Sequence, residues 1–371
     1  MSDASALRRP AWLNFAVAGF LAVWVTAAIF PLLWTAVMSF RLPVDALSSD
    51  PLTVLLGPAT AAAGKGLGGA DLGLAVGLMG ALVAWLTRLG RRGGGGVAVA
   101  CVLTWVVCRL LDIGTAPVLG LTLQHYRSVW IDHAFYRNFE NSLIITAGVV
   151  TVSLTVGTLA GYALARTTSR LGFALLMLAL VFRALPHSVL VSGYRPVFLG
   201  SHDLLAPLWN APGLGAVLRL FSLEPPTLYG QPLALIIVLV SINQPFTIWM
   251  MRSFFDNIPT ELDEAARVDG CSHFEAFWRV IMPVMWPGVV TTGLFSFLLA
   301  YNDYLVTSLL LDAQSQTMVP AITQFLNRDT SSTDQIEAIA AAVSITAPLF
   351  LLVMVFQRQI VSGLTAGAVK G

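Results

Sequence analysis

The chain has 371 residues, of which 56% are hydrophobic and only 11% are charged. Soluble domains have roughly 45 to 50% apolar and about 25% charged residues, so this composition indicates a membrane protein. A formal net charge of +1 gives no reason to expect sequence-independent nucleic-acid binding. The three cysteines have neither CxxC spacing nor a matching histidine cluster, so neither a disulfide framework nor a zinc site is indicated.

Long apolar segments predict transmembrane helices. The first segment, within 1–42, follows Arg8 and Arg9 and is too long for a signal-peptide core, so we expect it to remain as a helix. A span needs about 20 mostly apolar residues. The other candidate segments are 72–86, 97–111, 142–164, 171–190, 232–251, 285–305 and 339–356. This makes eight predicted spans, of which the second and third are the least clear.

The positions of Lys and Arg predict the orientation, because short basic loops stay on the cytoplasmic side. Arg8 and Arg9 place the N-terminus inside. Threading eight spans from there returns the other basic clusters to the same side: Arg88, Arg91, Arg92, Arg166, Arg170, Arg358 and Lys370. The segments that fall outside are 41–71, 112–141, 191–231 and 310–337. Removing the second and third spans together leaves the parity unchanged, so the C-terminus and segment 256–283 are predicted to be cytoplasmic.

Segment 43–120 is predicted to contain a helical hairpin. Its two apolar arms flank the sequence RLGRRGGGG at 88–96, which reads as a cytoplasmic turn. Arg109 and Asp112 shorten the second arm, so a re-entrant or peripheral hairpin is the alternative to two spans. The stretch GPATAAAGKG at 57–66 lacks the spacing of a phosphate loop, and Gly66 stands where Ser or Thr must contact magnesium. It reads as a flexible external loop.

The segment NIPTELDEAARVDGCSHFEAFWRVIMPV at 257–284 gathers charge between two apolar spans. Acidic residues after Pro259 favour a helix start there, and Gly270 is a typical helix end. Ser272 and Glu275 have the spacing of a capping box, which predicts a second short helix that stops at Pro283. We therefore expect two short helices on the cytoplasmic face, the first with a small apolar surface formed by Leu262, Ala265, Ala266 and Val268.

This segment resembles the EAA loop of ABC-importer permeases. The matching residues are Glu264, Ala265, Ala266, Asp269, Gly270, Ile281 and Pro283. The stretches PFTIWMMRSFFDNIP, YNDYL and GYALARTTSR are also similar to permeases of the carbohydrate-uptake branch, close to the second permease subunit of maltose-type importers. The resemblance covers about 12–40 and 124–371.

The resemblance implies an all-α polytopic protein of the bacterial inner membrane. Six helices would form the permease core and the hairpin would add two, giving about eight transmembrane helices with both termini cytoplasmic. The regions would be 1–42 with the first helix, the insert 43–120, and the permease domain 121–371 with its coupling loop at 256–283. The implied partners are a second permease subunit, two ATPase subunits that hold ATP and magnesium, an extracytoplasmic solute-binding protein and membrane lipid.

Polar residues within spans are candidates for a solute path, since they usually face a bundle interior or water. They form two clusters, one with Asn243 and Gln244 and the other with Tyr301, Asn302, Asp303 and Tyr304. Their amide, carboxylate and aromatic groups suit sugar hydroxyls and rings. Hydrogen bonding between helices is the alternative reading for each cluster. Arg183 lies near the outer end of its predicted span. Its side chain either extends outward to the membrane surface or lines the external mouth.

The sequence thus predicts the permease subunit of an ATP-driven importer for a sugar, oligosaccharide or polyol. A stand-alone secondary transporter or channel is the main alternative, and it predicts inverted repeats, which we do not find. A membrane-embedded enzyme is the second alternative. The sequence contains no HExxH or GxSxG motif and no other catalytic constellation, and we expect no cofactor or metal on this chain.

Overall fold

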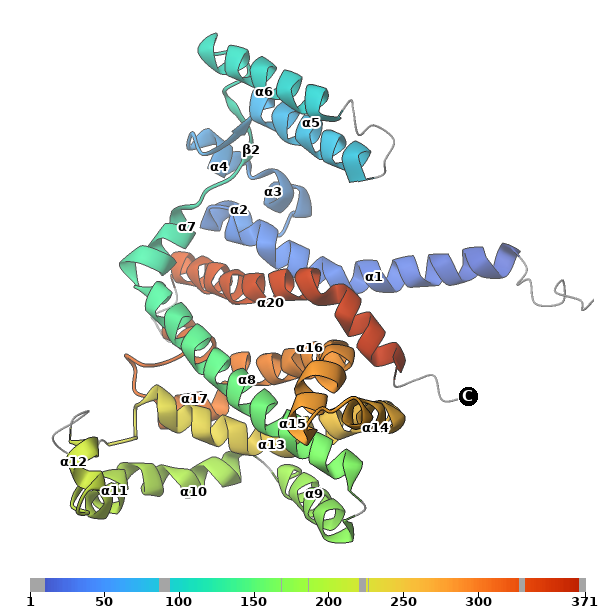
Figure 1. The fold of residues 1–371 in the computed structure, drawn as a ribbon. Helices are drawn as coiled ribbons and strands as arrows, with labels where there is room; N and C mark the ends of the chain where they lie inside the picture. The colour runs from blue at the N-terminus through green and yellow to red at the C-terminus, as the bar shows by residue number, and fades with distance from the viewer. Residues whose placement is uncertain are drawn as a thin grey trace, which may run out of the picture. The chain divides into compact units, whose positions relative to one another are not determined.

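The computed structural model describes residues 11–86, 94–167, 169–185, 187–219, 225, 227–326 and 331–366. Most of the predicted turn at 88–96 lies outside these residues. The chain divides into two compact units, one of residues 1–133 with 325–344 and the other of 134–324 with 345–371. Figure 1 traces the elements of both units along the chain. Each unit is described by itself.

Five helices of the described chain are long and apolar enough to cross a membrane: Trp12–Ser39, Phe135–Arg166, Pro232–Phe255, His273–Tyr301 and Ser332–Gln359. They belong to α1 (Ala11–Ser39), α8 (Phe135–Arg166), α13 (Pro232–Phe255), α16 (Met282–Tyr301) and α20 (Ser332–Ala366). Helices form there because hydrocarbon offers no partner to a backbone amide, so each amide must bond within its own segment. All five coincide with predicted spans.

The predicted single span 171–190 is wrong as one helix. α9 (Arg170–Arg183) ends at Arg183, and α10 (His187–Leu199) begins four residues later. Pro186 stands between them in the sequence, and proline removes a backbone donor and disfavours a continuous helix. Two further short helices follow, α11 (Ser201–Trp209) and α12 (Leu214–Leu218).

The first unit contains the insert 43–120 and two short elements that follow it. The insert contains α2 (Pro43–Ala46), α3 (Pro51–Leu56), α4 (Pro58–Ala62), β1 (Gly66–Gly68), α5 (Gly69–Leu86), α6 (Gly94–Leu110) and β2 (Pro117–Gly120). The elements that follow are α7 (Gln124–Arg127) and η1 (Ser128–Asp132). The strands β1 and β2 pair antiparallel, with Leu67 opposite Leu119. The chain is mainly helical, as predicted, and this short ribbon is an addition to the predicted helices. The two strands approach so closely that a Cβ atom at Gly66 would lie 3.0 Å from the Cα atom of Gly120.

Buried polar side chains fix the short helices of the insert. The carboxylate of Asp45, itself fully buried, accepts hydrogen bonds from the backbone amides of Ala59 (3.1 Å) and Thr60 (2.6 Å). Those amides begin α4 and have no partner inside the helix. Arg41 donates to the carbonyl of Val54 at 2.8 Å, near the end of α3. Segment 57–66, predicted to be a flexible loop, is thus largely held in place.

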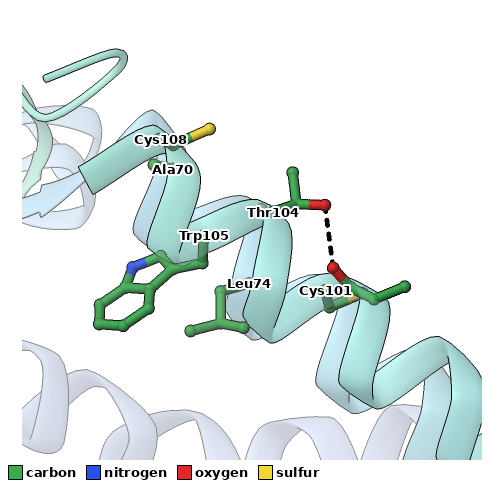
Figure 2. A pocket seen from close by; sticks show the side chains of 8 residues that line it. Ala70, Leu74, Cys101, Thr104, Trp105 and Cys108 are labelled. Carbon is green, nitrogen blue, oxygen red and sulfur yellow. Dashed lines mark hydrogen bonds between the residues drawn. The ribbon is translucent and has the colours of Figure 1, made fainter. Parts of the chain in front are cut away.

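The helices α5 and α6 form the predicted hairpin. They approach closely at Gly77, where a Cβ atom would come within 2.5 Å of the sulfur of Cys101. At the ribbon end of the hairpin, Asp71 accepts hydrogen bonds from Trp105 Nε1 (2.7 Å) and from Arg109 (2.9 Å). Figure 2 shows the residues that line a mostly apolar hollow on this hairpin, with Leu74 and Trp105 extending to the same side of the hairpin. Both predicted arms are thus helical, and their membrane crossing stays a prediction.

The second unit is organised around α8, which packs along α13 and against α16. Small residues on α8 permit close approach: a Cβ atom at Gly157 would meet Thr247, and one at Gly161 would meet Met251. The remaining elements are α14 (Glu261–Val268), α15 (His273–Ala276), η2 (Phe277–Ile281), α17 (Leu305–Leu310), α18 (Met318–Ala321) and α19 (Thr323–Leu326). The inner residues of α8 and α13 include Ile145, Val149, Leu235, Val238 and Leu239.

Candidate functional site

The first part of the predicted coupling loop is the helix α14. Three acidic residues lie in its first turn, where the helix dipole favours negative charge, and Arg267 lies in its last turn. The helix ends at Val268, and Gly270 follows with φ of +92°, a backbone conformation that other residues rarely adopt. The predicted helix and its glycine turn are both confirmed.

The second part begins as predicted but does not stop at Pro283. Ser272 caps α15, and Glu275 completes the capping box by accepting from the Ser272 amide at 3.0 Å. The chain then continues as one helical rod from His273 to Tyr301. A π-helical turn, Phe277–Ile281, precedes Pro283. The rod continues through Pro283, the second residue of α16, although proline removes a backbone donor there.

Asp263 joins α14 to the C-terminal end of α8. Its Oδ2 accepts from Arg166 Nε at 2.8 Å, and its Oδ1 accepts from the hydroxyl of Tyr162. Arg166 also donates to the carbonyls of Phe255 (3.2 Å) and Ile258 (3.3 Å), which follow from α13. One arginine therefore links α8, the end of α13 and α14, and a polar hollow of about 260 Å³ lies along this junction.

An aromatic cluster supports this junction from inside the unit. The ring of Tyr162 lies 4.8 Å from that of Phe277 and 5.4 Å from that of Phe255, measured between centroids. Ile281 is fully buried in the same cluster. Tyr162, Arg166 and Asp263 were not predicted as a group. The GYALAR stretch, which is predicted to be cytoplasmic, was the available signal, but its partner Asp263 lies about a hundred positions away.

The predicted coupling residues divide into an outer and an inner set. Glu264, Ala265, Asp269 and Gly270 are exposed, and so is Pro283 on the following helix. Ala266 is 5% exposed and Ile281 is fully buried, so both pack inside the unit rather than on its surface. The expectation that Ala266 shares an outer surface with Ala265 is therefore wrong. Apolar side chains that the loop does expose are Leu262, Val268, Phe274 and Trp278.

The first polar cluster lies between helices. Asn243 is 1% exposed, and its amide nitrogen donates to Ser296 Oγ on α16 at 2.8 Å. Gln244 reaches the carbonyl of Ser153 on α8 at 3.4 Å. The side-chain oxygens of Asn243 and Gln244 are buried and unbonded within the described chain. The positions bridge α8, α13 and α16, and neither residue lines the hollow formed by the second cluster.

The second polar cluster lies at a break after α16. This helix ends at Tyr301, whereas the predicted span continued to position 305, so the predicted end is wrong. Tyr301 is 1% exposed, and its hydroxyl donates to the carbonyl of Ile345 at 3.1 Å. Asp303 accepts from the amide of Thr307 at 3.0 Å, which holds the start of α17. Asn302, Asp303 and Tyr304 line a hollow of about 320 Å³ with Leu239 and Ile242 of α13.

The five membrane-length helices of the described chain indicate a polytopic membrane protein. The chain belongs to the family of binding-protein-dependent transport system inner membrane components, whose model matches residues 153–365. The insert lies outside this match.

Two curated relatives and one solved structure illustrate the similarity. The diacetylchitobiose uptake system permease protein of Streptomyces coelicolor is 36% identical over 259 residues, covering 68% of this chain and 82% of that protein. The trehalose transport system permease protein of Mycobacterium tuberculosis is 30% identical over 252 residues, covering 68% and 83%. A bacterial ABC transporter that imports the acidic polysaccharide alginate contains a chain of similar fold, with a TM-score of 0.52, 16% identity and coverage of 96% and 98%.

The predicted class is thereby confirmed. The chain is an inner-membrane permease subunit of an ABC importer, and it is a transport subunit rather than an enzyme. The alternatives of a stand-alone transporter and a membrane-embedded enzyme are set aside by family membership.

Proposed function

We propose that this permease carries a sugar, oligosaccharide or polyol across the membrane. Uptake-system permeases for diacetylchitobiose and for trehalose are among its relatives, and they support this class of solute. An extracytoplasmic binding protein delivers the solute, and a second permease completes the path. Two ATPase subunits bind ATP and magnesium and supply the energy.

The helix α14 is proposed as the element that docks on an ATPase subunit. The observation that carries this proposal is the two-sided arrangement of α14: Asp263 is bonded inward to Arg166, while Glu264 and Ala265 face outward. A small outward residue such as Ala265 permits close approach of a partner. The charged rim fixes orientation more than it adds affinity.

Motion of α14 has two routes into the membrane region. Through Asp263 and Arg166 it reaches the end of α8. Through the turn at Gly270 it reaches the helical rod His273–Tyr301, whose far end carries the Asn302–Tyr304 break. A packed helix shifts as a rigid element, so a displacement at the cytoplasmic end changes the other end.

The solute path is proposed to include the hollow lined by Asn302, Asp303 and Tyr304. A volume of about 320 Å³ is in the range of small-ligand sites, and the carboxylate and phenol groups suit sugar hydroxyls. The Asn243 and Gln244 pair is proposed to act beside the path rather than in it. Its hydrogen bonds to Ser296 and Ser153 favour helix packing.

For topology we propose about eight transmembrane helices with both termini in the cytoplasm. The hairpin α5–α6 supplies two of them, and α9 with α10 forms one interrupted crossing. At about 1.5 Å per residue, α5 with its 18 residues is about 27 Å long, close to the thickness of the hydrocarbon core.

Substitution of Ala265 tests the docking role of α14. Ala265→Arg places a long cation on the proposed docking face, and we expect at least a tenfold loss of ATPase subunits that co-purify with the tagged permease. The second permease should co-purify as before. Asn257→Arg is the matched control, since it adds the same charge at an exposed position just before α14. Equal recovery of ATPase subunits with both variants would reject α14 as the docking element.

A further inference from the structure

Arg183 is a cation inside the second unit without an acidic partner. It is the last residue of α9, and its guanidinium carbon lies 4.7 Å from the ring centroid of Phe246 on α13. Among the residues that the structure describes, no Asp or Glu forms an ion pair with it. Within the described part of the chain, the ring of Phe246 is the group that its guanidinium contacts.

The depth of Arg183 follows from the position of Phe246. Phe246 lies close to the middle of α13, a helix of 24 residues that is long and apolar enough to cross a membrane. At about 1.5 Å per residue this helix is about 36 Å long, so its central turns lie near the middle of a hydrocarbon core of about 30 Å. With α13 crossing the membrane along its length, the contact with Phe246 puts Arg183 beside the central turns of α13, which favours a side chain directed inward over one that points outward.

An arginine at this depth indicates which way the surrounding surface faces. A charged side chain is costly in hydrocarbon, and in membrane proteins it faces the bundle interior or a water-filled cavity. The face of α13 that carries Phe246 is therefore directed toward a polar space and not toward lipid.

Two further aromatic side chains lie beside Phe246, the ring that Arg183 contacts. The ring of Phe246 lies 6.2 Å from that of Trp249 and 6.1 Å from that of Phe295, the latter on α16. Trp249 is 45% exposed and Phe295 is 37% exposed. Aromatic faces offer apolar area to the C–H face of a pyranose ring, while a guanidinium offers paired donors that match a carboxylate.

We propose that Arg183 is the counter-charge for an acidic group on the transported solute, which makes the solute an anionic saccharide such as a uronate-containing disaccharide. This inference rests on the proposed function as a carbohydrate permease. The sugar ring packs on Trp249 and Phe295, and its carboxylate pairs with Arg183. The pairing occurs near the membrane midplane, where a bare charge on either partner is costly.

The charge of the segment around Arg183 is consistent with an anionic solute. Segment 171–202 contains Arg183 and Arg195 and no Asp or Glu. Arg195 on α10 is exposed and lies 5.9 Å from the ring centroid of Tyr229.

Transport of matched sugars tests the proposal. The complete importer, with its second permease, ATPase subunits and binding protein, is reconstituted in liposomes with ATP. The probes are a panel of neutral disaccharides and the same disaccharides with one C6 hydroxymethyl oxidised to carboxylate. We expect the uronates to enter at least tenfold faster than their neutral partners. Arg183→Gln should remove most of this preference, and Arg183→Lys should retain part of it. Phe246→Leu keeps the charge and removes the ring beneath it, so it should weaken the preference less than Arg183→Gln.

Three outcomes would overturn the inference and are distinguishable. Equal uptake of neutral and acidic probes, unaffected by Arg183→Gln, leaves the carbohydrate function standing and rejects an anionic solute. Loss of the second permease from the Arg183→Gln complex, but not from the Arg183→Lys complex, identifies the counter-charge as a carboxylate of that subunit. Uptake of neither probe, although the binding protein stimulates ATP hydrolysis, rejects the proposed class of solute itself.

Discussion

Arg166 and Asp263 are 97 positions apart in the sequence, and Nε of the first donates to Oδ2 of the second at 2.8 Å. Their side chains are only 14% and 12% exposed, so the pair is largely shielded from water. In such a pair the loss of one partner leaves the other with an uncompensated charge. The bond therefore holds α14 against α8 more firmly than a surface ion pair would.

Removal of this carboxylate should loosen α14. For Asp263→Ala we expect a loss of about 3 kcal/mol in the local stability of the loop, since Arg166 is left unpaired. Hydrogen exchange of the amides in segment 255–270 should then accelerate by about a hundredfold. The double variant Arg166→Asp with Asp263→Arg restores a pair of opposite charges, and it should recover part of the protection from hydrogen exchange. If Asp263→Ala exchanges like the wild type, the pair is not what holds the loop.

The turn at Gly270 should be required for coupling. A Cβ atom there would meet nothing within 4 Å, so the expected cost arises from φ of +92° and not from a clash. Gly270→Leu should insert in the membrane normally but bind the ATPase subunits weakly. Gly19→Leu is the control, because Gly19 is equally open but has no positive φ. Full ATPase stoichiometry and transport with Gly270→Leu would show that Gly270 plays no part in coupling.

Asp303 can act in the solute path or as the residue that holds α17. Asp303→Ala removes both roles, and we expect uptake to fall about 5- to 150-fold, corresponding to about 1 to 3 kcal/mol, while assembly and basal ATP hydrolysis survive. Asp303→Asn keeps an oxygen that can accept from the Thr307 amide, now 3.0 Å away. Normal uptake with Asn would assign Asp303 to helix capping, as would dissociation of the complex with Ala.

The orientation of the hairpin can be read by cysteine labelling. In a chain whose own Cys101, Cys108 and Cys271 are replaced, Gly94→Cys at the start of α6 should react with impermeant reagents only from the cytoplasmic side. A separate variant that keeps Cys271 as its single cysteine serves as the marker for the cytoplasmic side. Asp203→Cys marks the opposite side, because the Asp203 side chain is 91% exposed in an expected external segment. Labelling of Gly94→Cys from outside would eliminate the two-span hairpin.

The first unit should lose stability as the pH falls. His125 is 1% exposed and donates from Nε2 to the carbonyl of Arg41 at 3.1 Å, and burial lowers the pKa of its imidazole. The unfolded chain, with an imidazole pKa of about 6.5, then binds more protons than the folded chain. The stabilising contribution is therefore present above about pH 6.5 and is lost as the pH falls below it.

Thermal unfolding of the purified chain measures this effect. The unfolding temperature should drop between about pH 7.5 and about pH 5.5, and His125→Gln, which can still donate to the carbonyl, should show a smaller drop. The pair of His133 and Glu337, 3.3 Å apart, is present in both proteins. The comparison between wild type and variant isolates His125. Identical drops would exclude it as the cause.

Local features of this protein followed from the sequence. The five long spans are fixed by hydropathy, because a backbone in hydrocarbon has no alternative to internal hydrogen bonds. The cap formed by Ser272 and Glu275 and the turn at Gly270 depend on neighbours within a few positions, so their spacing predicted them correctly. The break between Arg183 and His187 was missed because apolar composition continues through it.

Only the tertiary structure decided which face of each helix meets which neighbour. Tyr301 and Asp303 stand two positions apart in a polar cluster, yet Tyr301 is buried against the chain near Ile345 and Asp303 lines a hollow. In the sequence Asp263 is one of several acidic residues in its segment, and only the packing of α8 shows that Arg166 is its partner. The contact of Arg183 with the ring of Phe246 on another helix could not be read from the sequence. These assignments depend on contacts between segments far apart in the chain, and a helical repeat specifies a face without specifying what covers it.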